Sequence, residues 1–88
     1  MPHTSLYLYT SVGCHLCEQA EALLVEVMGA QSERVLPVEV ADSDELMASY
    51  ALRIPVVAGS NRAGEWCELG WPFDSGELWT FLQQFSLQ

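Results

Sequence analysis

The stretch Ser5-Leu-Tyr-Leu-Tyr-Thr10-Ser-Val-Gly-Cys14-His-Leu-Cys17 decides the fold, because it joins a strand pattern to a helix pattern through two cysteines. Leu6 and Leu8 alternate with tyrosines, which predicts a strand over residues 5–10. Apolar residues recur at helical spacing after the motif, and Gly29 is a suitable stop, so an amphipathic helix is expected there. Its apolar stripe comprises Ala20, Leu23, Leu24, Val27 and Met28.

The two cysteines lie one helical turn apart, with Cys14 at the start of the predicted helix. Unpaired N–H groups and the positive end of the helix dipole favour a thiolate there, so we expect the pKa of Cys14 to lie below that of a free cysteine. The pair predicts thiol–disulfide exchange, in which Cys14 attacks a substrate disulfide and Cys17, buried one turn later, resolves the mixed disulfide. A protonated His15 would stabilise the thiolate further; the alternative is an exposed His15 with little influence.

The composition limits the classes of partner. The chain has 88 residues, enough for a single domain over 1–88, and a net charge of −9 from twelve acids and three arginines. Without clustered basic residues we expect neither nucleic acid nor membranes as partners. The acidity favours solubility, with a preference for basic or neutral partners as the alternative. Because no secretory signal or long apolar run is visible, we expect a cytoplasmic protein. We also expect it to be a monomer.

The rest of the chain predicts three further strands and two further helices. The residues Val35–Val40 form a second strand, and Pro37 favours an edge or a strand start. Further predictions are a helix over 42–50, strands over 54–58 and 65–69 joined by a turn over 59–64, and a helix over 74–85. The order is β-α-β-α-β-β-α, an α/β class. It predicts a mixed four-stranded sheet flanked by helices, with a parallel first crossover and an antiparallel closing hairpin.

Three segments in this order resemble the short bacterial glutaredoxin-like proteins, which have the thioredoxin fold. They are Leu8-Tyr-Thr-x-x-Gly-Cys-His-Leu-Cys17, Ile54-Pro-Val-Val57 and Gly70-Trp-Pro-Phe-Asp74. The resemblance implies a dithiol oxidoreductase with a cis peptide bond before Pro55, facing the cysteine pair. Such a bond would leave the backbone of Ile54 free to pair with an extended substrate peptide.

The resemblance is incomplete at the positions that bind glutathione. Typical glutaredoxins carry a lysine shortly before the first cysteine and a Gly-Gly pair before the last helix. Here residues 11–13 hold no cation, and Trp71-Pro72 stands near the Gly-Gly position. We therefore expect no bound cofactor, with glutathione as a candidate reductant only, and a disulfide-containing protein or small-molecule thiol as substrate. The expected substrate-binding residues are Gly13, His15, Leu16, Arg53, Ile54, Pro55, Asp74 and Ser75.

Two other functions stay open beside the redox enzyme. One is a thioredoxin-fold interaction module with incidental redox activity. The other is a metal or iron–sulfur site, which one Cys-x-x-Cys supplies with only two ligands, whereas zinc usually takes four. The third cysteine, Cys67, is interpreted as a small buried apolar residue, with a third redox thiol as the alternative. The aromatic residues from 66 to 85 are expected mostly in the core, although Trp71 and Phe73 could form an apolar rim.

Overall fold

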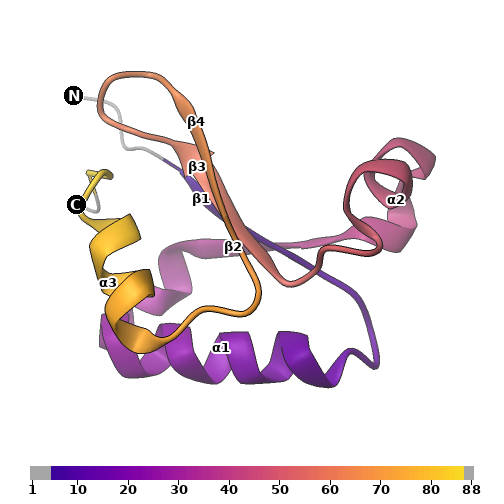
Figure 1. The fold of residues 1–88 in the computed structure, drawn as a ribbon, viewed down its shortest axis with the longest axis horizontal. Coiled ribbons are helices and arrows are strands. Elements are labelled where there is room, and N and C mark those ends of the chain that lie inside the picture. The colour runs from indigo at the N-terminus through magenta and orange to yellow at the C-terminus, as the bar shows by residue number, and fades with distance from the viewer. Residues whose placement is uncertain (1–4, 87–88) are drawn as a thin grey trace.

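The computed structural model describes residues 5–86 and has the element order expected from the sequence (Figure 1). Two 3-10 turns, η1 and η2, flank the second strand and were not anticipated. The elements are β1 (Leu6–Thr10), α1 (His15–Met28), η1 (Gly29–Arg34), β2 (Val35–Glu39), η2 (Val40–Asp42), α2 (Asp44–Tyr50), β3 (Val56–Ser60), β4 (Trp66–Gly70) and α3 (Ser75–Leu82).

The four strands form one mixed sheet in the order β2-β1-β3-β4. β1 pairs with β2 in parallel, whereas β3 pairs with both β1 and β4 in antiparallel orientation. Pro37 lies on the edge strand β2, as expected for a residue without an N–H donor. The α/β class, the mixed sheet and the thioredoxin-like element order are thereby confirmed.

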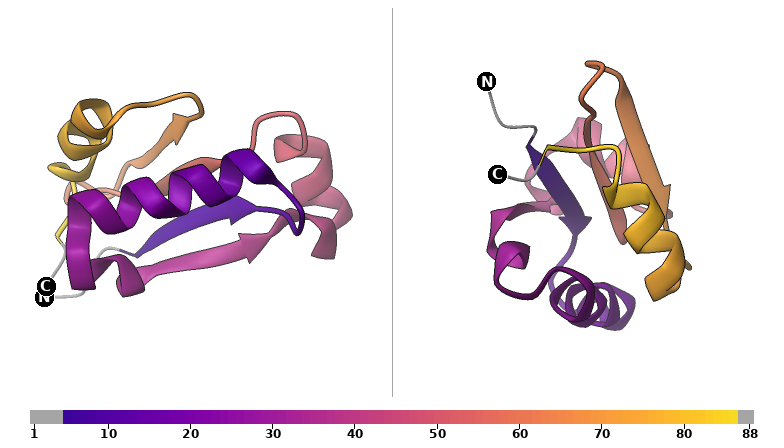
Figure 2. Two further views of the ribbon diagram at one scale, coloured as in Figure 1. Left: turned by 90° about the horizontal axis from the view of Figure 1, so that it is seen from below. Right: turned by 90° about the vertical axis from the view of Figure 1, so that its left-hand side faces the viewer.

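The two faces of the sheet are covered by different helices. α1 and α3 pack on one face, where Leu8 and Val57 meet Ala20, Leu24 and the buried side chains of α3. The short helix α2 serves the other face, where Tyr9, Val56 and Ala58 are joined by Leu46 and Tyr50. Figure 2 shows α1 lying along β1 and β2, and α2 displaced toward one end of the sheet. The seven residues of α2 leave part of the second face open.

Two tryptophans that were expected mostly in the core are exposed, each for a different reason. Trp66 is 49% exposed, because the first residue of β4 lies on the part of the second face that the short helix α2 leaves open. Trp79 is 57% exposed, because it lies beside Leu78 on α3, off the helix stripe that faces the sheet. The three phenylalanines Phe73, Phe81 and Phe85 are buried, as expected.

Several boundaries differ from the expected ranges, and two of them affect the site or the core. The third strand begins at Val56 rather than residue 54, because the Ile54–Pro55 bend precedes the first paired residue. The last helix ends at Leu82, and Phe85 is buried from the turn that follows. No helix within residues 5–86 has the length and apolar character needed to cross a membrane.

Candidate redox site

A disulfide bond joins Cys14 and Cys17 at the start of α1. Cys14 is the N-cap residue, with extended backbone angles, and its Sγ accepts a hydrogen bond from the Cys17 N–H at 3.1 Å. The Cα atoms of the pair lie 5.2 Å apart. Cys14 is half-buried, whereas Cys17 is only 2% exposed. The first sulfur is therefore the one that a substrate can reach.

The loop before the disulfide is held by backbone geometry and by Glu39. Gly13 has a φ of 81°, a left-handed value at which a side chain would be strained. The Val12 N–H donates to Glu39 Oε1 at 2.8 Å, and the Ala41 N–H donates to Oε2 at 3.0 Å. These bonds, led by the one from Ala41, hold the pKa of Glu39 below its ordinary value.

A hollow of about 250 Å³ opens beside the disulfide. Its walls come from the loop after β1, the first two turns of α1 and the end of β2. The lining includes both cysteines and three carboxylate residues, Glu18, Glu21 and Glu39. The parallel register of β1 and β2 places Thr10 opposite Glu39, which brings the end of β2 beside the loop that leads to Cys14.

The two residues inside the motif face solvent. The His15 side chain is 90% exposed, and its Nδ1 lies 3.8 Å from Glu18 Oε1, an ion pair only when the imidazole is protonated. Leu16 is 45% exposed. Both are therefore available to a substrate that approaches Cys14.

The Ile54–Pro55 peptide bond is cis, as the resemblance implied, and Trp71–Pro72 is a second cis bond. Pro55 is buried, and its carbonyl oxygen accepts the Trp71 N–H at 3.0 Å. Because Val56 pairs with Tyr9, the bend lies at the end of the sheet where β1 leads toward Cys14. Pairing of Ile54 with a substrate backbone stays a prediction.

The guanidinium of Arg53 is paired with Glu68 on the face of the sheet that carries α2. Arg53 Nη2 lies 2.7 Å from Glu68 Oε1, and Arg53 Cζ lies 5.1 Å from the ring centre of Tyr50. Tyr50 in turn stacks on Tyr9 at 4.2 Å between ring centres. Arg53 is not among the residues that line the cysteine hollow, and its role in substrate binding stays a prediction.

Glu68 collects three side-chain donors. The Tyr50 hydroxyl and Trp66 Nε1 both donate to Oε2, the latter at 3.0 Å, and Arg53 donates to Oε1. The hydrogen bond from Tyr50 is the largest of the causes that lower the pKa of Glu68 to about 2. Burial, with help from Glu68, raises the pKa of Tyr50 to about 12.

Asp74 is the N-cap of α3, with the capping box that its spacing predicted. Asp74 Oδ1 accepts the Glu77 N–H at 2.7 Å, and Glu77 Oε1 accepts the Asp74 N–H at 3.0 Å. Asp74 lines a separate open hollow along α3 that includes neither cysteine, and Ser75 begins the helix. Their role in substrate binding stays a prediction.

Cys67 is a half-buried free cysteine rather than the fully buried residue expected. Asn61 Nδ2 donates to its Sγ at 3.4 Å, and the Sγ donates to Gln84 Oε1 at 3.5 Å. Its pairing with Gly59, opposite Leu6, places it at the far end of the sheet from Cys14. Within residues 5–86, no group of three or more His, Cys, Asp or Glu residues is arranged to hold a metal ion.

The model of the Glutaredoxin-like domain (DUF836) family matches residues 5–83. The chain belongs to this glutaredoxin-like family. A crystal structure of a protein from X. campestris is similar, with 34% identity over 90% of this chain and 96% of that chain, and a TM-score of 0.73. No match is found among the curated proteins.

Two more distant structures share the thioredoxin fold of this glutaredoxin-like chain. The solution structure of protein Ne2328 from Nitrosomonas europaea is 21% identical, covers 92% of this chain and 93% of that chain, and has a TM-score of 0.68. The crystal structure of oxidised thioredoxin O2 from Arabidopsis thaliana is 17% identical, covers 93% and 74%, and has a TM-score of 0.58. At these identities the likeness concerns the fold alone.

Sequence reasoning missed Glu39 and Glu68, the two carboxylates that accept the most hydrogen bonds among the described residues of this glutaredoxin-like chain. A signal for Glu39 was present, because the carboxyl ends of parallel strands meet at one sheet edge, and Glu39 ends the strand beside β1. Glu68 had no comparable signal, since its donors Tyr50 and Arg53 are 18 and 15 residues away.

Proposed function

We propose that this glutaredoxin-like protein is a dithiol thiol–disulfide oxidoreductase that reduces disulfides of proteins or small molecules. The observation that supports it most is the Cys14–Cys17 bond, in which Cys14 is half-buried at the helix N-cap and Cys17 is buried. The unpaired N–H groups of the first turn of α1 support a thiolate on Cys14 once the bond is reduced.

The exchange runs in two displacements. The Cys14 thiolate attacks one substrate sulfur, the substrate disulfide breaks, and the first substrate thiolate leaves. The Cys17 thiolate then attacks Cys14 Sγ, which restores the intramolecular disulfide and releases the second substrate thiolate. The two protein thiols have given up two electrons and two protons, and a thiol reductant, for which glutathione is a candidate, regenerates them. A cytoplasmic role in redox homeostasis is part of the proposal, because thiols are kept reduced there.

A mixed-disulfide trap tests this function. In a Cys67→Ser background, Cys17→Ser removes the resolving thiol, so we expect Cys14 to stay bound to its substrate in non-reducing gels and in mass spectra. The matched control, Cys14→Ser with Cys17→Ser, should capture nothing. Capture of glutathione alone would make the protein glutathione-dependent, and capture of proteins would make it a protein disulfide reductase. Absence of any adduct, with partners retained by the double variant, would instead identify an interaction module.

A further inference from the structure

The carboxylates beside the disulfide have no cation among the residues that line the same hollow. Glu18, Glu21 and Glu39 line it together with Cys14 and Cys17, and no lysine or arginine within residues 5–86 contributes to its walls. Glu39 is fixed there by its two backbone donors. The nearby His15 side chain is outside the lining and is 90% exposed. A substrate that approaches the sulfurs from this side therefore meets negative charge.

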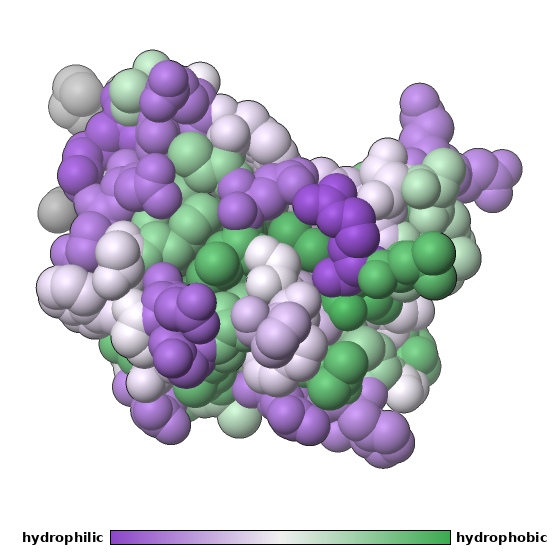
Figure 3. All heavy atoms as spheres, viewed as in Figure 1, coloured by the Kyte–Doolittle hydropathy of each residue, from purple (hydrophilic) through white to green (hydrophobic). Residues whose placement is uncertain are grey.

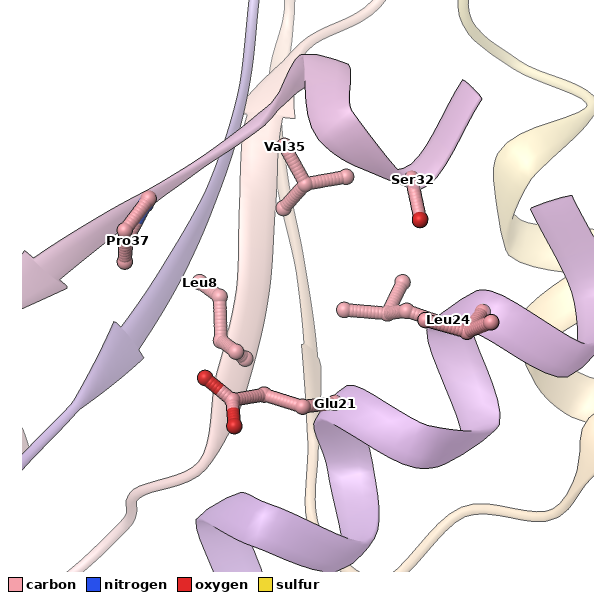
Figure 4. A pocket seen from close by; sticks show the side chains of 7 residues that line it. Leu8, Glu21, Leu24, Ser32, Val35 and Pro37 are labelled. Carbon is pink, nitrogen blue, oxygen red and sulfur yellow. The ribbon is translucent and has the colours of Figure 1, made fainter. Parts of the chain in front are cut away.

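The negative charge beside the disulfide continues at Glu21 into the groove between α1 and β2. It also lines a second hollow of about 210 Å³ whose other walls are mainly apolar, with Leu8, Leu24 and Pro37 among them. Figure 4 shows the Glu21 side chain extending from α1 toward the strands, with its carboxylate beside Leu8. The carboxylate thus lies over the groove rather than on the outer surface of the helix.

The arginine closest in the sequence to the cis-proline bend already has a carboxylate partner. Arg53 is paired with Glu68 at 2.7 Å on the sheet face that carries α2, whereas Cys14 lies at the start of α1. Arg53 and Glu68 neutralise each other, so the net charge near the disulfide stays negative.

Figure 3 shows hydrophobic surface toward the side of the molecule that carries α2 and the first turn of α1. Exposed side chains available at this end include Val12, Leu16 and Leu52.

We propose that the Cys14–Cys17 site selects disulfides that carry positive charge beside the bond, such as cystines flanked by lysine or arginine, over anionic ones such as glutathione disulfide. This selectivity rests on the proposed reductase function and names its substrate class. Charges of one sign lining a cleft raise the local concentration of opposite charges and repel like charges, with effects on association of roughly 10- to 1000-fold at low salt. The effect operates on the encounter and on the first attack by Cys14.

The test follows one turnover of the fully reduced protein with three small disulfides. Cystamine carries two ammonium groups, bis(2-hydroxyethyl) disulfide is neutral, and glutathione disulfide is anionic. Oxidation of the Cys14–Cys17 pair is followed by quenching with an alkylating agent and mass spectrometry. Each rate is divided by the rate of the same disulfide with dithiothreitol, which removes differences in intrinsic reactivity. We expect the normalised rate for cystamine to exceed that for glutathione disulfide by about tenfold or more at low salt.

High salt and matched variants separate this cause from others. The ratio should fall below about threefold when salt reduces the Debye length to about 3 Å, at about 1 M. Glu21→Gln and Glu39→Gln should each lower the ratio at low salt by about two- to threefold; Glu21→Gln does so without removing the backbone bonds of Glu39. Glu33→Gln removes the same charge from η1, which follows α1, and should leave the ratio unchanged because α1 alone spans about 20 Å from its start to Met28 at the helical rise.

The outcomes distinguish the selectivity from the function. If the neutral disulfide does not oxidise the pair, the proposed oxidoreductase is wrong. If the neutral disulfide reacts but the ratio is near one at low salt, or if Glu33→Gln lowers it as much as Glu21→Gln, the charge selectivity is wrong and the function stands.

Discussion

α1 and α3 are both capped by the side chain of their N-cap residue, but the capping atom is a sulfur in α1 and a carboxylate oxygen in α3. At α1 the Cys14 Sγ accepts the N–H three residues on, at 3.1 Å, and at α3 the Asp74 Oδ1 accepts the equivalent N–H at 2.7 Å. Asp74 is further supported by the reciprocal bond from its own N–H to Glu77, and Cys14 has no such partner within its first turn. Sulfur is also the weaker acceptor.

The difference shows how one helix position supports either stability or reactivity. The N–H groups at the start of α3 are committed to a carboxylate that does not change during any reaction. The same groups in α1 face a sulfur that alternates between a disulfide and a thiolate, so their stabilisation of negative charge contributes to the chemistry. Breaking each cap in turn should therefore have different consequences.

Cys14→Ser should have the largest effect, and it should fall on activity alone. Serine cannot attack a disulfide, so reduction should drop to the uncatalysed rate, measured with bis(2-hydroxyethyl) disulfide. Serine is among the preferred N-cap residues, so the free energy of unfolding should change by less than about 1 kcal/mol relative to the reduced wild type. Cys67→Ser is the matched control and should keep both. Activity in Cys14→Ser would show that the exchange does not start at this sulfur.

Asp74→Ala tests the other cap and should act on stability. Loss of the bond to the Glu77 N–H, with its reciprocal partner, should lower the free energy of unfolding by about 1 kcal/mol, as N-cap substitutions generally do. Urea unfolding under reducing conditions measures the difference. Asp74→Asn keeps the acceptor oxygen without the charge and should lose less than half as much. Equal stabilities of Asp74→Ala and the wild type would mean that the capping box contributes nothing measurable.

The parts of the fold that the sequence predicted depend on short-range patterns. The alternation in residues 5–10 indicated β1, the spacing of Asp74 and Glu77 indicated the start of α3, and Pro37 indicated an edge strand. The cysteine pair at the start of α1 was likewise readable, because motif, strand and helix are contiguous.

The parts that the sequence did not predict depend on contacts between distant residues. The pairing of Arg53 with Glu68 follows from the position of β4 beside β3, whereas the sequence indicated Arg53 only as a cation for a substrate carboxylate. The exposure of Trp66 follows from the length of α2, which apolar composition does not reveal. The Glu39 bond to the Val12 N–H joins residues 27 apart through the parallel pairing of β1 and β2.

Glu68 sharpens the comparison of the helix caps, because it is a second carboxylate that accepts fixed donors away from the disulfide. Its pKa falls from an ordinary 4.5 to about 2 in the folded protein. A depressed pKa of an acid means that the stabilisation is complete above about pH 4.5 and is lost as the pH falls toward 2. A shift of this size corresponds to roughly 3 kcal/mol at full strength, and screening near the surface reduces the expected contribution to under about 1 kcal/mol.

Glu68→Gln should remove this part of the pH dependence. The difference in unfolding free energy between wild type and variant should be largest at neutral pH and should shrink as the pH falls through the range between 4.5 and about 2. Carboxylates common to both proteins cancel in that difference, and Glu33→Gln controls for the change in net charge. A difference that stays constant across this range would show that the donors of Glu68 contribute by packing and not by holding its charge. In either case the loss should be smaller than the loss at Asp74, because Glu68 orients side chains whereas Asp74 begins a helix.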